Sequence, residues 1–393
     1  MKAFLQDYCV ASLDHSVSRG YLDGLEHMLA RLNPSSDLVQ AVKVVALAGF
    51  AHKHERPDIL DLSKMLIVDN SRSAWTAHHA RKSPLRKENG THSRGVSAIL
   101  STDRSPFDIL TGAQVFQLGN PLHLNPAQLQ DSRHFGILCA PSSGATVQTL
   151  DSLLVKSRPI FQMAEELLSN SREISADELS QFRADVMLLM RQFAEWPANQ
   201  PEKWSPTTVG FVHQSHEELQ GTIYWPGQVH AYFDLYVSGV WNAYRKARLL
   251  FLDRVVRCMI RLGFGEEQWL WGRFHSEVRE LAVDVAASVP FHLTATAEKP
   301  LQIPHTATAT AATAGISVGG LLLPHPLCVA STLSIVPPEL RIYFKGCLVW
   351  IGQHMGIGQA ALLAKDPKSV PYSFIKDGHV LVWAGMLIQP QAS

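Results

Sequence analysis

The segment from residue 315 to residue 365 constrains the fold of this 393-residue chain more than any other. It is apolar, rich in glycine and other small residues, and nearly free of acidic side chains. Removing such a segment from water is favourable, so we expect it to be buried against other parts of the same chain. Pro324, His325 and Pro326 interrupt its longest apolar run, so no unbroken stretch of about 20 apolar residues remains to span a bilayer.

Composition agrees with a large buried core and argues against some functions. Hydrophobic residues make up 46% of the chain, so disorder along its whole length is not expected. Basic and acidic residues number 35 each, whereas a free-standing nucleic-acid-binding domain usually carries a basic excess. The five cysteines are all at least nineteen positions apart, which predicts reduced intracellular thiols rather than disulfides or a metal-binding knuckle.

Several segments have the spacing of apolar residues that is typical of helices. The clearest follows a capping box formed by Ser175 and Glu178, and it ends at Trp196-Pro197. Alternation with a period of two, which would indicate strands, is nearly absent. It is hinted at only by Phe211-Val212 and by residues 380–383. Further helices are expected over residues 36–54, 58–68 and about 231–262.

We therefore predict an all-α fold, an irregular multi-helix bundle of packed helix pairs with long loops. Polar, turn-rich stretches interrupt the helical pattern, and the last of them covers residues 300–318. We interpret these stretches as loops, so that residues 1–393 form a single helical domain.

Several segments of the chain resemble one protein family, the fungal-specific regulatory domain found downstream of the zinc binuclear cluster in fungal transcription factors. The match is weaker and shorter in residues 1–95. The segments near the C-terminus that are similar to the family's closing helices are 319–327, 333–336, 350–352 and 356–360. The matching upstream segments are 232–237, 240–245, 94–95 and 105–108.

This resemblance implies a nuclear protein that regulates transcription of metabolic genes, including those of secondary-metabolite clusters, and that is not an enzyme. Regulation would proceed through protein–protein contacts or an effector-linked conformational change. The family contacts DNA through six closely spaced cysteines that share two zinc ions, and the sequence contains no such cluster. We therefore expect no metal and no cofactor, only indirect contact with DNA, no membrane, and as partners other transcription regulators or a second copy of the chain.

Two groups of cations suggest contacts with phosphate or with acidic partners. The first would be a nuclear-localisation signal or a basic arm, or else a solvated loop, and it consists of Arg81, Lys82, Arg86 and Lys87. The second follows the predicted long helix and consists of Arg245, Lys246, Arg248, Arg254, Arg257 and Arg261. Because Leu249, Leu252 and Val256 give that helix an apolar side, we expect an ordinary amphipathic helix with a charged outer face.

Two motifs suggest enzyme chemistry but lack part of what that chemistry needs. His213 and His216 would share a helix face as zinc ligands, yet the acids follow both histidines instead of lying between them. The segment 356–361 matches the dinucleotide pattern G-x-G-x-x-A after a strand-like segment, 347–351. Only 35 residues follow Gly358, too few for the further βαβ units required, so we interpret this motif as a close helix crossing.

A set of aromatic and imidazole side chains lies in segments expected to form the core. In one hypothesis these side chains line a pocket for an effector. In the alternative they pack in the core and bind nothing. A small-molecule enzyme or binding protein on the helical scaffold would require titratable groups to converge on one pocket. A third hypothesis is an interaction partner that titrates a full-length regulator. The residues of the pocket hypothesis are Trp241, Tyr244, His275, His325 and His354.

Overall fold

The computed structural model describes much of the chain and confirms the all-α class, since 72% of the described residues are helical. It describes residues 2–14, 17–18, 20–23, 25–31, 37–54, 56–63, 65–66, 150–169, 173–263, 268–294 and 315–365. Among the helices in these ranges, none is long and apolar enough to cross a membrane.

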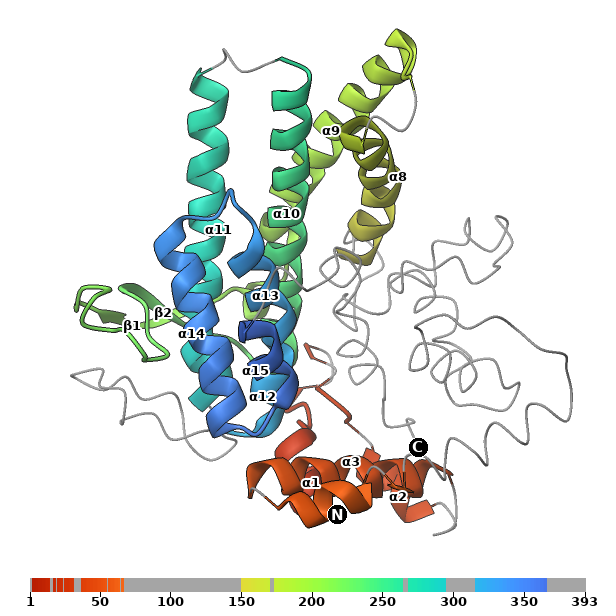
Figure 1. Cartoon of the computed structure of the whole chain (residues 1–393), viewed down its shortest axis with the longest axis vertical. Helices are drawn as coiled ribbons and strands as arrows, with labels where there is room; N and C mark the ends of the chain where they lie inside the picture. The colour runs from red at the N-terminus through yellow and green to blue at the C-terminus, as the bar shows by residue number, and fades with distance from the viewer. Residues whose placement is uncertain are drawn as a thin grey trace, which may run out of the picture.

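Two long antiparallel helices, α10 (Leu235–Arg261) and α11 (Gln268–Thr294), form the centre of the fold (Figure 1). Asp234 caps the start of α10, because its carboxylate accepts a hydrogen bond from the Val237 backbone N–H at 2.9 Å. The expected start near residue 231 is therefore wrong: Ala231 ends a strand, and the aspartate begins the helix. After α10, Gly263 adopts a φ of 78°, which suits glycine after a helix end.

Helices α8 (Leu150–Ser169) and α9 (Ala176–Glu195) pack together, and α8 also contacts α10 (Figure 1). The predicted capping box is confirmed: Ser175 and Glu178 each bond the other's backbone N–H at the start of α9. The apolar face of α9 is buried through Phe182, Val186, Leu189 and Phe193. The expected end of this helix is also confirmed, because a short 3-10 turn, Pro197–Asn199, follows Trp196.

Helices from the segment 315–365 pack on the α10–α11 pair away from α8 and α9 (Figure 1). They are α12 (Ser317–Leu322), α13 (Pro324–Thr332), α14 (Pro338–His354) and α15 (Gly358–Lys365). Residues 347–351, which are strand-like in sequence, lie in the helix α14. The close helix crossing is confirmed, since a Cβ added at Gly352 would lie 2.7 Å from the Ala361 Cβ. The glycines of the G-x-G-x-x-A pattern thus join two helices rather than a strand and a helix.

A small hairpin made of β1 (Thr207–Val212) and β2 (Gly227–Ala231) lies beside α11 (Figure 1). The strands are antiparallel, with Thr207 opposite Ala231 and an irregularity between Thr208 and Gly210. The hint of a strand at Phe211-Val212 is confirmed in β1, whereas β2 was not predicted. Residues 380–383, the other predicted strand, lie outside the described residues.

The N-terminal helices α1 (Lys2–Tyr8), α2 (Leu25–Arg31) and α3 (Asp37–Lys53) build a small second core around Phe4, Leu25 and Val42. The segment between α1 and α2 ties this layer to the central pair. The Trp204 indole N–H donates to the Val17 carbonyl at 2.8 Å. Ser18 donates a hydrogen bond to the capping carboxylate of Asp234.

Candidate functional site

Polar side chains line the buried contact between α10 and α11. On α10 they follow each other at spacings of four and three, and on α11 at spacings of four. Because the helices are antiparallel and these spacings keep residues on one helix face, the two series lie opposite each other. We call these six residues the polar seam: Ser238, Asn242 and Arg245 of α10, with Asp284, Ser288 and His292 of α11.

The middle of the polar seam is closed by hydrogen bonds between side chains. Asn242 Nδ2 donates to Ser288 Oγ at 2.9 Å and lies 3.1 Å from His292 Nε2. Ser238 Oγ lies 2.8 Å from the same imidazole nitrogen. All four side chains are buried, so a shift of one helix along the other would leave several polar groups without partners. The seam therefore favours a single register of α10 against α11.

His292 is neutral in this environment. Burial lowers its pKa to about 3, and the positive charge of Arg245 acts in the same direction, while the backbone of Gly319 acts against it. Because Asn242 Nδ2 donates toward Nε2, we assign the imidazole proton to Nδ1. A Cβ added at Gly319 would lie 1.8 Å from the His292 carbonyl oxygen, so glycine allows α12 to cross α11 at this point.

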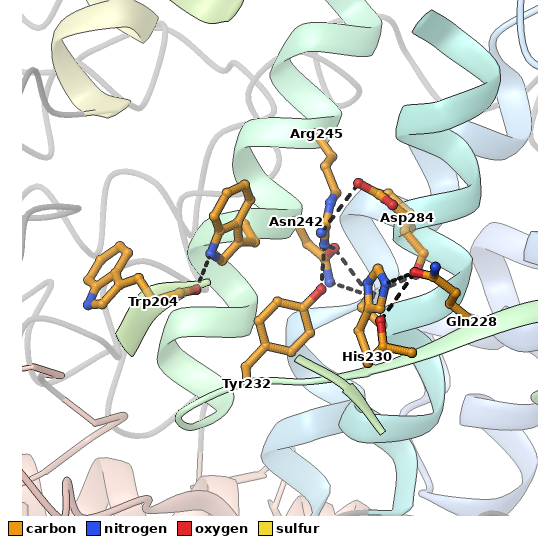
Figure 2. A network of polar contacts seen from close by, with 11 residues as sticks. Trp204, Gln228, His230, Tyr232, Asn242, Arg245 and Asp284 are labelled. Carbon is orange, nitrogen blue, oxygen red and sulfur yellow. Dashed lines mark hydrogen bonds and ion pairs between the residues drawn. The ribbon is translucent and has the colours of Figure 1, made fainter. Parts of the chain in front are cut away.

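Arg245 is the charged member of the seam, and its side chain is only 1% exposed (Figure 2). Its Nη1 donates to Tyr232 Oη at 2.8 Å and to Asn242 Oδ1 at 3.1 Å. Its guanidinium carbon lies 5.4 Å from the centre of the Trp241 ring and 5.7 Å from that of Tyr232. Nη2 is 3.7 Å from the Asp284 carboxylate, and neither Nε nor Nη2 has a hydrogen-bond partner.

The end of β2 borders the Arg245 end of the seam (Figure 2). His230 Nε2 lies 3.1 Å from Gln228 Oε1, which also accepts a hydrogen bond from Thr208 Oγ1 at 3.2 Å. Burial lowers the pKa of His230, and the Arg245 charge lowers it further, while Asp284 raises it. The other ring nitrogen, Nδ1, is buried without a hydrogen-bond partner.

A second buried arginine joins α9, α10 and α11. Arg248 Nε donates to Glu277 Oε1 at 2.6 Å, and its Nη1 donates to the Met190 carbonyl at 3.2 Å. Its guanidinium also lies over the Phe193 ring. The prediction that this part of α10 has a charged outer face is therefore wrong: Arg245, Lys246 and Arg248 are buried, whereas Arg257 and Arg261 are exposed.

Two of the residues of the pocket hypothesis lie together in the core. Trp241 Nε1 donates to the Trp204 carbonyl at 2.7 Å, and Tyr244 Oη donates to the Phe193 carbonyl at 2.9 Å. Their rings are 6.0 Å apart, and Trp196 packs on both. Of these rings, Trp241 lies beside the Arg245 guanidinium.

The three histidines of that hypothesis lie on three different helices. His275 is exposed on α11, His325 is buried near the start of α13, and His354 is exposed at the end of α14, stacked on Trp350. An ion pair of 3.3 Å between Arg279 and Glu339 places α11 beside the first turn of α14. His354 lies fifteen residues further along, about 22 Å at 1.5 Å per residue. His275 and His354 therefore do not form the convergent pair that the enzyme hypothesis requires.

The remaining candidates from the sequence form no site in the described residues. His213 follows β1 and is exposed, and His216 pairs with Glu217 at 2.9 Å, so the two do not share a helix face. In the part of the chain that the structure describes, no group of three or more His, Cys, Asp or Glu side chains is placed to hold a metal ion. Outside the described residues lie Arg81, Lys82, Arg86 and Lys87.

Comparison with known proteins gives the chain a relative along nearly its whole length. It is 36% identical, over 426 aligned residues, to transcription factor dbaG of Emericella nidulans. The alignment covers 99% of this chain and 96% of that protein. No model of a known protein family matches the chain, and no solved structure matches it. At this identity and coverage, the chain belongs to the family of transcription factor dbaG.

Proposed function

We propose that this protein is a nuclear regulator of transcription that acts on metabolic genes, including genes of a secondary-metabolite cluster. The observation that carries the proposal is its 36% identity to transcription factor dbaG over 99% of its length. The resemblance of residues 319–327 and 350–360 to the fungal-specific regulatory domain agrees with it and adds the expected class of target genes. Catalysis forms no part of the proposal.

The proposed mechanism is a conformational change of the α10–α11 pair. The polar seam and the Arg248–Glu277 pair connect these helices to α9 and to β2 through groups that lose their partners if the register shifts. We propose that the pair has a second arrangement, separated from the described register because intermediate positions leave buried polar groups unpaired. An effector or partner that binds one arrangement more tightly than the other would shift the population toward it.

The proposed contact with DNA is indirect. The sequence has five widely spaced cysteines where a zinc binuclear cluster needs six at close spacing. We propose that the chain binds another transcription regulator, or a second copy of itself, and reaches its target genes through that assembly. The basic run from Arg81 to Lys87 is the proposed nuclear-localisation signal.

The test combines two measurements in cells that contain the gene for this chain. Occupancy of chromatin by a tagged copy is mapped, and transcript levels across the genome are compared with and without the chain. We expect occupancy near a limited set of metabolic genes whose transcripts change when the chain is deleted. If the tagged chain is absent from chromatin and deletion changes no transcripts, the proposed function is wrong. A matched strain that carries tagged protein with Arg86→Ala and Lys87→Ala tests the localisation signal, which predicts retention outside the nucleus.

A further inference from the structure

One edge of the Arg245 guanidinium lacks a matched partner. The hydrogens of Nη1 are used by Tyr232 Oη and Asn242 Oδ1, at 2.8 and 3.1 Å. Nε and Nη2 form the other edge, and both are buried without a hydrogen-bond partner. Asp284 Oδ2 is 3.7 Å from Nη2, beyond the length of a hydrogen bond. Buried N–H groups of a cation that lack acceptors destabilise the fold, so a ligand that supplies an acceptor to Nε and Nη2 would be stabilising.

The free edge has the geometry of a carboxylate receptor. Nε and Nη2 of an arginine present two parallel N–H groups whose spacing matches the two oxygens of a carboxylate. Three contacts hold the guanidinium in place: the two hydrogen bonds of Nη1, and the Trp241 and Tyr232 rings at 5.4 and 5.7 Å. Since the arginine is already oriented, a ligand would not have to order it.

The surroundings of the Arg245 guanidinium are aromatic, since the Trp241 and Tyr232 rings pack against it. Tyr232 packs against Phe291 with ring centres 5.6 Å apart, and Trp241 packs against Trp196 at 5.2 Å. Rings of this kind favour a ligand whose body is flat and apolar. The buried Nδ1 of His230 adds one further polar group near Arg245 without a partner.

Asp284 is the acidic neighbour of this edge, with Oδ2 3.7 Å from Nη2. Its side chain is 48% exposed, so it can rotate into water without becoming buried elsewhere. Nε and Nη2 are shut off from solvent, so a ligand that bonds to them would take the place of this carboxylate. The exchange keeps one negative charge beside the buried cation, and it replaces a distant, solvated carboxylate with one in direct contact.

We propose that the Nε–Nη2 edge of Arg245 binds the carboxylate of a small aromatic acid, which displaces Asp284. The proposal deepens the effector-linked regulation described above and rests on it, because it names the chemical class of the effector. Binding would act directly on the polar seam, since Arg245 shares Asn242 with Ser288 and His292. The acid thereby favours one arrangement of α10 against α11.

The test measures ligand binding to the purified full chain by calorimetry. The probe is benzoate, with benzamide as its neutral equivalent and acetate as a carboxylate without a ring. We expect benzoate to bind and both controls to bind at least tenfold more weakly. Benzamide loses the charged hydrogen-bonded pair, which adds about 1.4 kcal/mol or more, and acetate loses the apolar contact of the ring. Equal binding of benzoate and benzamide, or no binding of benzoate at millimolar concentration, overturns the proposal.

Two variants and a control locate the site. Asp284→Asn removes the competing charge at a half-exposed position, so benzoate should bind roughly tenfold more tightly while benzamide is unaffected. Arg245→Lys loses the paired donors and should weaken benzoate binding at least tenfold. Arg279→Lys, an exposed arginine of α11, should change nothing. If Arg245→Lys does not fold, Asp284→Asn decides: unchanged benzoate affinity in that variant overturns the proposal.

This experiment is independent of the transcript measurements. Binding is observed without DNA, partners or cells, so absence of benzoate binding removes the effector class and leaves the proposed regulator intact. Conversely, a chain that binds benzoate and leaves every transcript unchanged on deletion contradicts the proposed function but keeps the binding site.

Discussion

Asn242 of α10 and Ser288 of α11 lie 46 residues apart in the chain and hydrogen-bond to each other in the middle of the core. Asn242 Nδ2 is 2.9 Å from Ser288 Oγ, which in turn lies 3.2 Å from Asn242 Oδ1. Both side chains are completely buried. Because the same asparagine also contacts His292 and Arg245, this one pair connects the neutral and the charged halves of the polar seam.

Gly319→Ala should destabilise the protein by about 3 kcal/mol or more. The added Cβ would lie 1.8 Å from the His292 carbonyl oxygen, which belongs to the backbone of α11 and cannot move aside as a flexible side chain would. Chemical denaturation measures the change in the free energy of unfolding. Gly346→Ala is the control, since it is an exposed helical glycine with nothing near its Cβ position, and it should stabilise by about 0.5–1 kcal/mol. A neutral Gly319→Ala would contradict the close crossing of α11 and α12.

Arg248→Met should cost about 3 kcal/mol. It leaves Glu277 and the Met190 carbonyl without their guanidinium partner in a largely buried position. Thermal or chemical unfolding measures the difference in the free energy of unfolding between the variant and the unaltered protein. Arg279→Met breaks a second arginine–glutamate pair, with Glu339, whose partners are 59% and 35% exposed, and it should cost less than about 1 kcal/mol. Equal losses of stability in the two variants would show that burial does not strengthen the contribution of the Arg248–Glu277 pair.

Stability should fall as the pH is lowered from about 6.5 toward 3. His292 has a pKa of about 3 in the folded protein because it is buried, against 6.5 as its ordinary value. Between these values the unfolded chain binds a proton that the folded chain does not, so acid favours unfolding. The contribution is about 1.4 kcal/mol per pH unit at most, and it is fully recovered above pH 6.5.

Denaturation of His292→Gln across this pH range checks the assignment. The variant should be less stable near pH 7 but should have a shallower pH dependence than the unaltered protein. Ser238→Ala removes a hydrogen bond to the same ring and keeps the imidazole, so its pH dependence should persist. An identical pH slope in the unaltered protein and in His292→Gln would mean that His292 is not buried neutral.

Much of the fold could be predicted from local sequence signals. The capping box of Ser175 and Glu178 and the apolar spacing after it defined α9 to within a residue or two, because both signals lie within one helix. The start of α10 was misplaced because continuing apolar spacing does not distinguish the end of β2 from a helix, whereas the cap at Asp234 does. Strand β2 was missed because a hairpin is recognised by its partner strand, fifteen residues away.

The polar seam could not be recognised from periodicity. Arginines within an apolar helix usually mark its solvent side, and that rule failed for Arg245 and Arg248 because α11 supplies their counter-charges, Asp284 and Glu277. The signal that was available is the matching spacing of polar residues on two consecutive long helices. Reading it requires knowing that α10 and α11 are antiparallel neighbours, which is a tertiary property. Trp241 and Tyr244 lie together because they are three residues apart on one helix.

The fold and the proposed mechanism depend most on the polar seam acting as one connected unit. A double-mutant cycle with Asn242→Ala, Ser288→Ala and the double variant, followed by chemical denaturation, measures this directly. We predict a coupling free energy of at least about 1 kcal/mol, because the two side chains share two buried contacts and each single change removes both. Single changes that add to within about 0.5 kcal/mol in the double variant would contradict the seam.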